Sequence, residues 1–290
     1  MPSAVLAGVT LHYVEAGRGR PVVLVHGMAC GWRMWRSQIR ALSPHFHVVA
    51  YDQRGHGLST APDDEAAYSQ AILADDLAGL IRELDLAPAL IVGLSLGGAV
   101  AIELAIRHPG LAAALVIADA GSGSDDPEAA RRLCDAWATA TRAEGIDRFA
   151  ALMLASPFFA GYLAAGGRRA RRQLELLVRR NPASGLAHLM AQVGGRRPPV
   201  YARAAELARL TQPTLVICGE RDRACLKPSA FLAETIPGAE LVVLPQLGHM
   251  TNLEAPRLFN AAILDFLTRT GATPAGIARS TVANQQRRPT

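Results

Sequence analysis

The chain has few cysteines and no long apolar segment. Its four cysteines, Cys30, Cys134, Cys218 and Cys225, form no CxxC pair, so neither a disulfide framework nor a zinc module is indicated. The longest apolar runs, such as residues 111–118, are much shorter than the ~20 residues of a membrane-spanning helix, and no basic segment precedes an apolar one at the N-terminus. We therefore expect a cytoplasmic protein with no membrane span and no export signal.

Charged residues are also scarce, at 19% of the 290 residues, whereas half of the chain is hydrophobic. A disordered chain combines low hydrophobicity with high charge, so this composition predicts a folded core. The length suits one large α/β domain or a domain with an inserted module. The net charge is +5, and because Lys227 is the only lysine, arginine carries it. No nucleic-acid-binding motif accompanies the arginines, so we expect no nucleic-acid partner.

Short runs rich in leucine and β-branched residues alternate with longer amphipathic stretches. This alternation predicts a mostly parallel sheet with helices on both faces. Residues 11–15 predict an antiparallel edge hairpin with its turn at Gly17 and Gly19. The expected strands are 21–26, 46–51, 89–93, 114–118, 214–218 and 240–244, and helical spacing marks residues 68–84 and 256–267.

The alternation stops between residues 122 and 205, where only helical runs with paired arginines are found. A helical insertion between two parallel strands lies at the carboxyl edge of the sheet, over the crevice where such folds bind ligands. We predict a helical cap at 122–205, inserted into a core of residues 1–121 and 206–270. The polar tail, 271–290, is expected to be disordered.

Ser95 lies in the sequence Gly-Leu-Ser-Leu-Gly-Gly, between a predicted strand and a predicted helix. A strained strand-to-helix turn has no room for nearby β-carbons, and Gly93 and Gly97 leave that room. The turn would expose the Ser95 hydroxyl and point the Leu96 N–H at a developing oxyanion. An ordinary glycine-rich turn is the alternative. A dinucleotide-binding loop matches less well, because the segment has no G-x-G-x-x-G.

A second glycine-containing turn, residues 26–31, follows the strand at 22–25 and opens toward the same edge of the sheet. The Met28 N–H can therefore act as the second donor of an oxyanion hole.

A serine hydroxyl needs a base to become a nucleophile at neutral pH. His249 is the favoured base, because it follows a predicted strand on a short loop at the carboxyl edge. His26 and His56 lie near the same edge but are interpreted as loop-shaping residues. His108 ends a helix, where it complements the helix dipole. His12, His45 and His47 lie on the wrong side of the sheet.

The acid that orients this base should follow another strand. Asp222 is the leading candidate and Asp119 its rival, although Asp119 can also be read as a cap at the start of the insertion. Glu220 and Asp52 also lie at strand ends, but Asp52 is close enough to Arg54 in sequence to suggest an ion pair. The chain order serine, aspartate, histidine is that of the hydrolases.

Five ordered motifs together resemble the α/β-hydrolase superfamily over about residues 10–270, in particular its small cytosolic esterases, enol-lactonases, cofactor-free haloperoxidases and meta-cleavage C–C hydrolases. The motifs are VHGMACGW (25–32), DQRGHGLS (52–59), GLSLGG (93–98), ICGERD (217–222) and GHMTNLEAPRLFNAAILDFL (248–267). The resemblance implies an eight-stranded, mostly parallel sheet with a helical cap after the sixth strand. It implies these roles: Ser95 nucleophile, His249 base, Asp222 acid, and Met28 and Leu96 N–H groups as oxyanion hole.

The activity implied is hydrolysis of a carboxylic ester or lactone of a small, largely apolar substrate, through an acyl-enzyme and without metal or organic cofactor. The alternatives are a C–C bond hydrolase of a ring-cleavage diketone and a ligand-binding homologue without catalysis. The chain lacks HGGPG and HGxGPG, which disfavours proline iminopeptidases and C–C hydrolases. A serine in place of aspartate disfavours dehalogenase and epoxide hydrolase chemistry.

Aromatic and methionine side chains are candidates for an apolar pocket, although such residues on helices are often simply core. The candidates are Trp32, Trp35, Trp137, Met153, Phe158, Phe159 and Met250. The arginines of the insertion can attract a carboxylate-bearing substrate or an acidic acyl-carrier protein, or form a solvated face, which is the favoured interpretation. The sequence does not indicate an oligomeric state.

Overall fold

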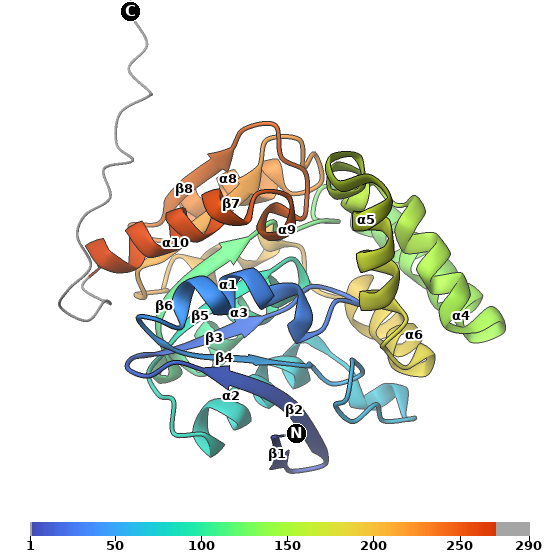
Figure 1. The fold of residues 1–290 in the computed structure, drawn as a ribbon, viewed down its shortest axis with the longest axis horizontal. Helices are drawn as coiled ribbons and strands as arrows, with labels where there is room; N and C mark the ends of the chain where they lie inside the picture. Colours follow the sequence, from blue (N-terminus) through green and yellow to red (C-terminus); the bar gives the residue numbers. More distant parts are fainter. Residues whose placement is uncertain (1, 271–290) are drawn as a thin grey trace, which may run out of the picture.

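An eight-stranded sheet runs through the middle of the computed structural model, which describes residues 2–270 (Figure 1). Its order is β1-β2-β4-β3-β5-β6-β7-β8, and β3 to β8 run parallel to one another, which confirms the predicted sheet. The strands are β1 (Ser3–Leu6), β2 (Val9–Ala16), β3 (Pro21–Val25), β4 (His47–Tyr51), β5 (Ala89–Leu94), β6 (Ala112–Ala118), β7 (Thr214–Gly219) and β8 (Glu240–Leu244).

The edge hairpin exists, but the predicted position of its turn is wrong. Strand β2 pairs antiparallel with β1 on one side, across a turn at Gly8, and antiparallel with β4 on the other. Gly17 and Gly19 instead lead from β2 to β3, which is not its neighbour in the sheet. Strand β1 escaped prediction because four residues are too few to show an alternating pattern.

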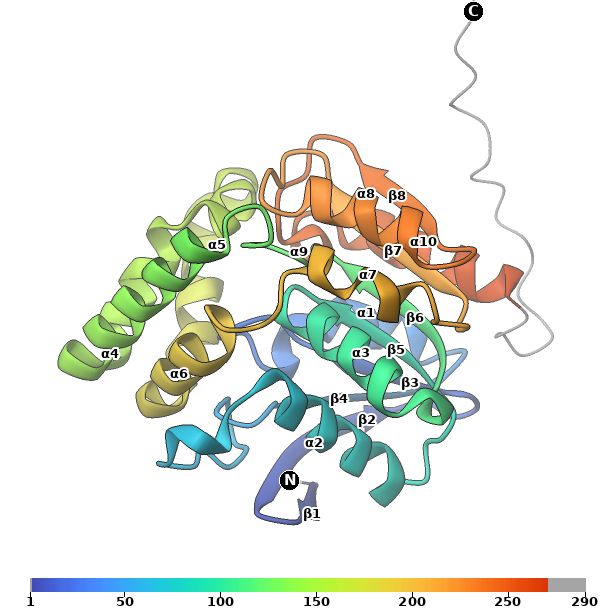
Figure 2. The same cartoon turned by 180° about the vertical axis from the view of Figure 1, so that it is seen from behind.

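Helices cover both faces of the sheet, so its central strands are apolar on both sides and read as continuous hydrophobic runs. Helices α1 (Arg36–Leu42) and α10 (Pro256–Arg269) lie in front of the sheet in Figure 1. Helices α2 (Gln70–Glu83), α3 (Leu96–Arg107) and α8 (Leu226–Thr235) cover the other face (Figure 2).

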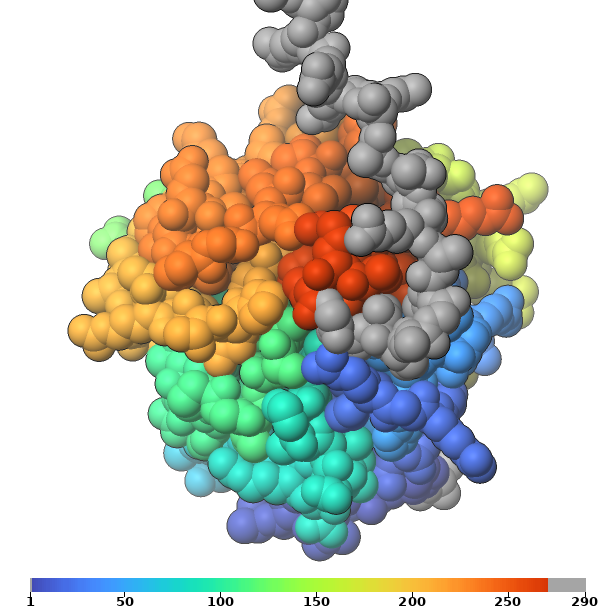
Figure 3. Space-filling model, turned by 90° about the vertical axis from the view of Figure 1, so that its left-hand side faces the viewer, coloured from blue at the N-terminus to red at the C-terminus, as the bar shows by residue number. Residues whose placement is uncertain are grey.

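The sheet and these helices form one core from both ends of the chain. Figure 3 views the side away from the cap helices, where segments coloured blue, green and orange pack side by side. The sequence motifs near the beginning and the end of the chain therefore belong to the same α/β core.

The insertion between β6 and β7 is helical, as predicted. It contains α4 (Pro127–Ala155), α5 (Ala160–Val178) and α6 (Ala183–Leu189), which lie together on one side of the core (Figure 1). Two further α-helices are short: α7 (Ala204–Leu207) lies just before β7, and α9 (Thr251–Glu254) lies outside the insertion, after β8. Helix α4 is broken at Gly145, whose φ is 77°. The predicted disordered tail, 271–290, lies outside the described residues.

Within residues 2–270, no single helix is long and apolar enough to cross a membrane. The bent pair of segments Pro127–Ala155 and Pro157–Val178 meets that test only jointly.

Candidate active site

Ser95 lies at the sharp turn between β5 and α3, with a positive φ of 55°. A β-carbon at Gly93 would lie 2.2 Å from the Gly97 carbonyl oxygen, and one at Gly97 would lie 1.9 Å from the Val25 carbonyl oxygen. The backbone therefore passes too close for any side chain at these two positions. A strained conformation held by close packing is typical of functional sites.

Gly97→Ala should destabilise the protein by about 3 kcal/mol, because the added methyl group enters the space of the Val25 carbonyl and the turn has to open. The free energy of unfolding, measured by urea denaturation, checks this. Gly110→Ala is the matched control, since a β-carbon at Gly110 meets no atom within 4 Å. Equal stability of the two variants would contradict the steric conflict at Gly97.

His249 and Asp222 follow β8 and β7 and meet below the cap. The His249 Nδ1 atom lies 2.7 Å from Asp222 Oδ2, and both side chains are buried. Glu254 accepts hydrogen bonds from the N–H groups of Gly248 and Met250, which holds the loop on either side of His249. Burial lowers the pKa of His249, but the charge and hydrogen bond of Asp222 outweigh it, so the net pKa is raised. The pair is built to hold a proton on Nδ1.

Asp119, the rival acid, ends β6 without a hydrogen bond to the imidazole. Its carboxyl oxygens accept the Gly219 N–H at 2.9 Å and the Thr251 hydroxyl at 2.5 Å. Burial raises the pKa of Asp119 to about 8. Asp119 thus ties β7 to the start of α9, behind the His249 loop.

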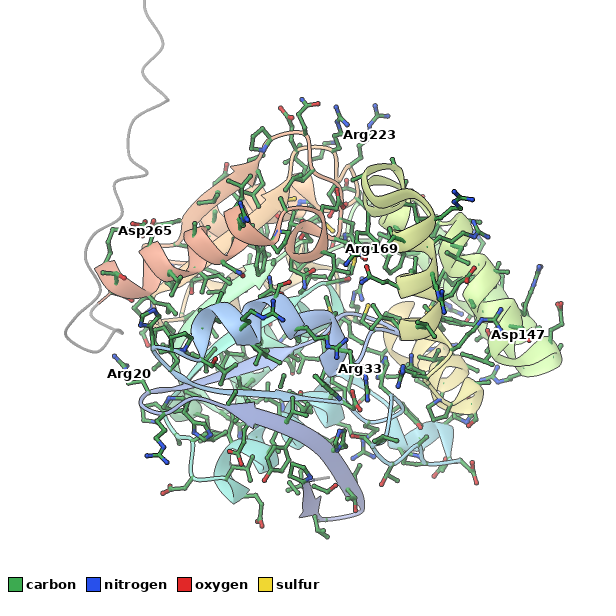
Figure 4. The ribbon with its side chains drawn as sticks, in the orientation of Figure 1. Arg20, Arg33, Asp147, Arg169, Arg223 and Asp265 are labelled. Atoms are coloured by element: carbon green, nitrogen blue, oxygen red, sulfur yellow. The ribbon has the colours of Figure 1, made fainter. Side chains whose placement is uncertain are left out.

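The other acid candidates face away from His249. Glu220 accepts the Gln246 N–H at the surface. The loop after β7 has both directions represented: Arg223, the residue after Asp222, points outward into solvent (Figure 4). At the end of β7, only Asp222 is directed inward to the imidazole.

The ion pair suggested for Asp52 and Arg54 is wrong. Arg54 makes a two-pronged pair with Asp76 on α2, with both N–O distances 2.7 Å. Asp52 instead accepts the N–H groups of Trp32 and Leu58. Asp52 and Arg54 are two residues apart in the chain but do not pair, because the Arg54 side chain turns toward α2.

His26 and His56 shape loops beside the site, as the sequence suggested. The Nε2 atom of His26 accepts the Gln53 N–H at 2.9 Å, and that of His56 accepts the Ala29 N–H at 3.1 Å. Burial lowers the pKa of both imidazoles, so each remains neutral and able to accept.

A cavity of about 380 Å³ lies between these loops and the cap, and Ser95 and His249 both line it. Among the hydrogen bonds of residues 2–270, none joins these two side chains. Of the predicted pocket residues, the structure brings these to the cavity: Trp137, Met153, Phe158, Phe159 and Met250.

Trp32 and Trp35 lie elsewhere. The Trp32 ring packs under the Arg33 guanidinium, 4.7 Å from its central carbon, and its backbone is held by Asp52. Trp35 is fully buried against Phe259 on α10. Trp32, predicted as a pocket residue, instead begins the short 3-10 helix Trp32–Trp35 and is not among the residues that line the cavity.

Met28 and Leu96 both line the cavity beside Ser95. Their backbone N–H groups donate no hydrogen bond to any residue among 2–270. The Leu96 N–H is among the first donors of α3, which have no partner within the helix. Both N–H groups are thus available to an acceptor in the cavity.

Arg197 lines the cavity near the end of the insertion and was not predicted as a site residue. Its signal is weak, because it is one arginine among many and is set apart only by the surrounding Gly-Gly-Arg-Arg-Pro-Pro turn.

Asp222, Cys225 and His249 lie close enough to share a metal ion, with ligand atoms within 4.8 Å of one another. Burial raises the pKa of the Cys225 thiol well above its usual value. A neutral thiol is a poor metal ligand, and Asp222 is already engaged by His249. The arrangement suits a histidine–aspartate pair better than a metal centre.

Comparisons with known proteins agree with this geometry. A family model described as the alpha/beta hydrolase fold matches residues 20–256. A protein of Agrobacterium fabrum provisionally named carbamate hydrolase RutD is 32% identical, over 89% of this chain and 98% of its own. The 2-hydroxymuconate semialdehyde hydrolase of a Pseudomonas species is 29% identical, over 92% and 94%.

Among solved structures, the enol-lactonase of Burkholderia xenovorans superposes with a TM-score of 0.81 at 29% identity, over 92% of this chain and all of that one. The family match spans most of the chain, and the sheet order and cap are in place. The chain therefore belongs to the α/β-hydrolase family and is a hydrolase of that fold.

Proposed function

We propose that this protein is a serine hydrolase that cleaves the ester or lactone bond of a small, largely apolar substrate through an acyl-enzyme. The observation that carries the proposal is the 2.7 Å contact between His249 and Asp222, with the imidazole opening on the same cavity as Ser95. A binding protein has no need of a serine that shares a cavity with a histidine held by an aspartate.

In this mechanism His249 removes the Ser95 proton and the alkoxide attacks the substrate carbonyl. The Met28 and Leu96 N–H groups donate to the oxyanion that forms, and Asp222 stabilises the imidazolium. His249 then gives its proton to the leaving alcohol. Finally, it activates a water molecule that hydrolyses the acyl-enzyme. None of these steps calls for a metal or an organic cofactor.

The cavity walls favour a small substrate with apolar parts. Trp137, Phe158, Phe159 and Met250 contribute apolar surface around the reactive groups, and a volume of about 380 Å³ is at the small end for ligand sites. The similarity to an enol-lactonase supports attack at the acyl carbon of an ester or lactone.

A C–C bond hydrolase of a ring-cleavage diketone is the second candidate, favoured by the 29% identity to 2-hydroxymuconate semialdehyde hydrolase. The missing HGxGPG motif counts against it.

The cap arginines support the solvated-face interpretation, because several form exposed ion pairs, such as Arg148 with Glu144 and Arg179 with Asp147. The proposal therefore includes no acyl-carrier protein.

The four cysteines are all free, which fits the reducing cytoplasm.

A panel of substrates tests the proposal. The wild-type protein should hydrolyse p-nitrophenyl butyrate and a small lactone faster than a ring-cleavage diketone, and a fluorophosphonate probe should label Ser95. Initial rates and mass spectrometry of the labelled peptide are the measurements, with heat-denatured protein as control. Preference for the diketone would favour the second candidate, and resistance to the probe would favour a pocket without catalysis.

A further inference from the structure

We propose that Arg197 binds a carboxylate of the substrate, so that the preferred substrates are esters or lactones that carry a second, ionised carboxyl group. This inference rests on the hydrolase function proposed above and names its substrate class.

Arg197 is a half-buried cation that has no carboxylate partner among the residues that the structure describes. It lines the cavity that holds Ser95 and His249, and burial lowers the pKa of its guanidinium. Across residues 2–270 it forms no ion pair, whereas the adjacent Arg196 pairs with Asp135 at the surface. A charge removed from water is costly unless it is paired. An anionic ligand would complete this site.

The guanidinium is held in a fixed orientation. Its Nη2 atom donates to the Ser122 carbonyl oxygen at 2.6 Å and to the Ser122 hydroxyl at 2.8 Å. Guanidinium has five N–H donors, and those on Nε and Nη1 meet no acceptor in the described part of the chain. The free N–H groups of a planar guanidinium can donate two parallel hydrogen bonds to the two oxygens of a carboxylate.

The acidic residues near the cavity do not neutralise Arg197. Asp126 accepts the Ala129 N–H at 2.9 Å as the cap of α4, and Asp125 accepts the Tyr201 hydroxyl at 2.5 Å. Both side chains are exposed and line the same cavity, but neither forms an ion pair with Arg197. The unpaired positive charge is therefore available to a ligand.

Arg197 is also close enough to the reactive groups to act on the same molecule. Its charge is felt at His249, where it opposes the raising effect of Asp222 on the pKa of the imidazole. Apolar side chains such as Phe158 and Met190 line the same cavity. A short hydrocarbon chain in this space would join a carboxylate at Arg197 to an ester at Ser95. Anchoring the remote end of a substrate orients its reacting carbonyl.

The test compares substrates that differ only in charge. Monoethyl glutarate carries a carboxylate where ethyl glutaramate has a neutral amide, and the succinate and adipate pairs cover other lengths. For the best length, wild type should prefer the carboxylate. Arg197→Gln should lower the ratio of kcat/KM for acid over amide by about 10- to 100-fold. Arg197→Lys, which keeps the charge but loses the fork, should recover part of it.

Arg196→Gln is the matched control, because it removes a neighbouring arginine that faces solvent and pairs with Asp135; it should keep the wild-type ratio. Circular dichroism and Tm establish that each variant is folded. An Arg197→Gln ratio equal to that of wild type, in a folded protein, would overturn the inference and give Arg197 only the role of joining the insertion to Ser122.

Direct binding separates this inference from the proposed chemistry. Ser95→Ala should bind monoethyl glutarate in a calorimeter, and Ser95→Ala/Arg197→Gln should bind it at least tenfold more weakly. Binding with this pattern, but no ester hydrolysis by wild type, would reject the esterase and keep the carboxylate site. Equal binding by the two proteins would reject the carboxylate site whatever the reaction.

Discussion

Ser95→Ala is expected to lower kcat for p-nitrophenyl butyrate by on the order of 10⁴-fold or more, to near the uncatalysed rate. The substitution removes the only atom that is proposed to form the acyl-enzyme, and the remaining groups can then only hold the substrate. Alanine keeps the β-carbon, so the positive φ at this residue is no more strained than before. Steady-state rates together with Tm measure activity and folding separately.

Ser156→Ala is the matched control for this loss. Ser156 is buried between α4 and the short 3-10 helix Pro157–Phe159, and its hydroxyl has no hydrogen-bond partner among the described residues. It does not line the cavity, so its replacement should change kcat less than about threefold. Substantial activity in a folded Ser95→Ala protein would remove Ser95 from the mechanism.

Asp222→Asn is expected to lower kcat by on the order of 10⁴-fold, the effect known for the orienting acid of serine proteases. The amide can no longer fix the proton on His249 Nδ1 or stabilise the imidazolium. Asp119→Asn is the comparison, since it makes the same chemical change in another buried carboxyl group at a strand end. We expect it to cost less than about tenfold, because Asp119 contacts Gly219 and Thr251 rather than the imidazole. A larger loss in Asp119→Asn would exchange the roles of the two acids.

The pH profile gives the same pair a second readout. The base works only when neutral, so kcat/KM should fall as pH drops through the pKa of His249, which lies above the ordinary value of 6.5. Asp222 is the main group that raises this pKa, and its loss in Asp222→Asn should move the acid limb of the residual activity to lower pH. A profile that is flat from pH 5 to 8 in wild type would contradict His249 as the base.

Local sequence signals predicted most of the architecture. The parallel strands carry continuous apolar runs because both faces are covered, and α2 and α10 show helical spacing because one side packs on the sheet. Gly93 and Gly97 could be read from the sequence because a tight turn excludes β-carbons within a few residues. Strand β1 could not, since its pairing with β2 decides its conformation more than its own four residues do.

The side-chain environment of the site was less predictable. Asp222 and Asp119 have the same local setting, an acid after a strand, and the sequence could rank them only by chain order and resemblance. Trp32 follows a glycine turn next to the predicted site, and its local sequence does not reveal that its ring packs against Arg33 and that it does not line the cavity.

The order of strands and helices, the glycines around Ser95 and the candidate set of serine, acids and histidine were determined by the sequence itself. These features depend on residues close together in the chain, where steric fit and apolar spacing act directly. Only the tertiary structure decided that Asp222 rather than Asp119 reaches His249, that Arg54 pairs with Asp76, and that Arg197 lines the cavity without an acidic partner among residues 2–270. Each is a distance between residues far apart in the chain, and such distances are set when the sheet and cap pack together.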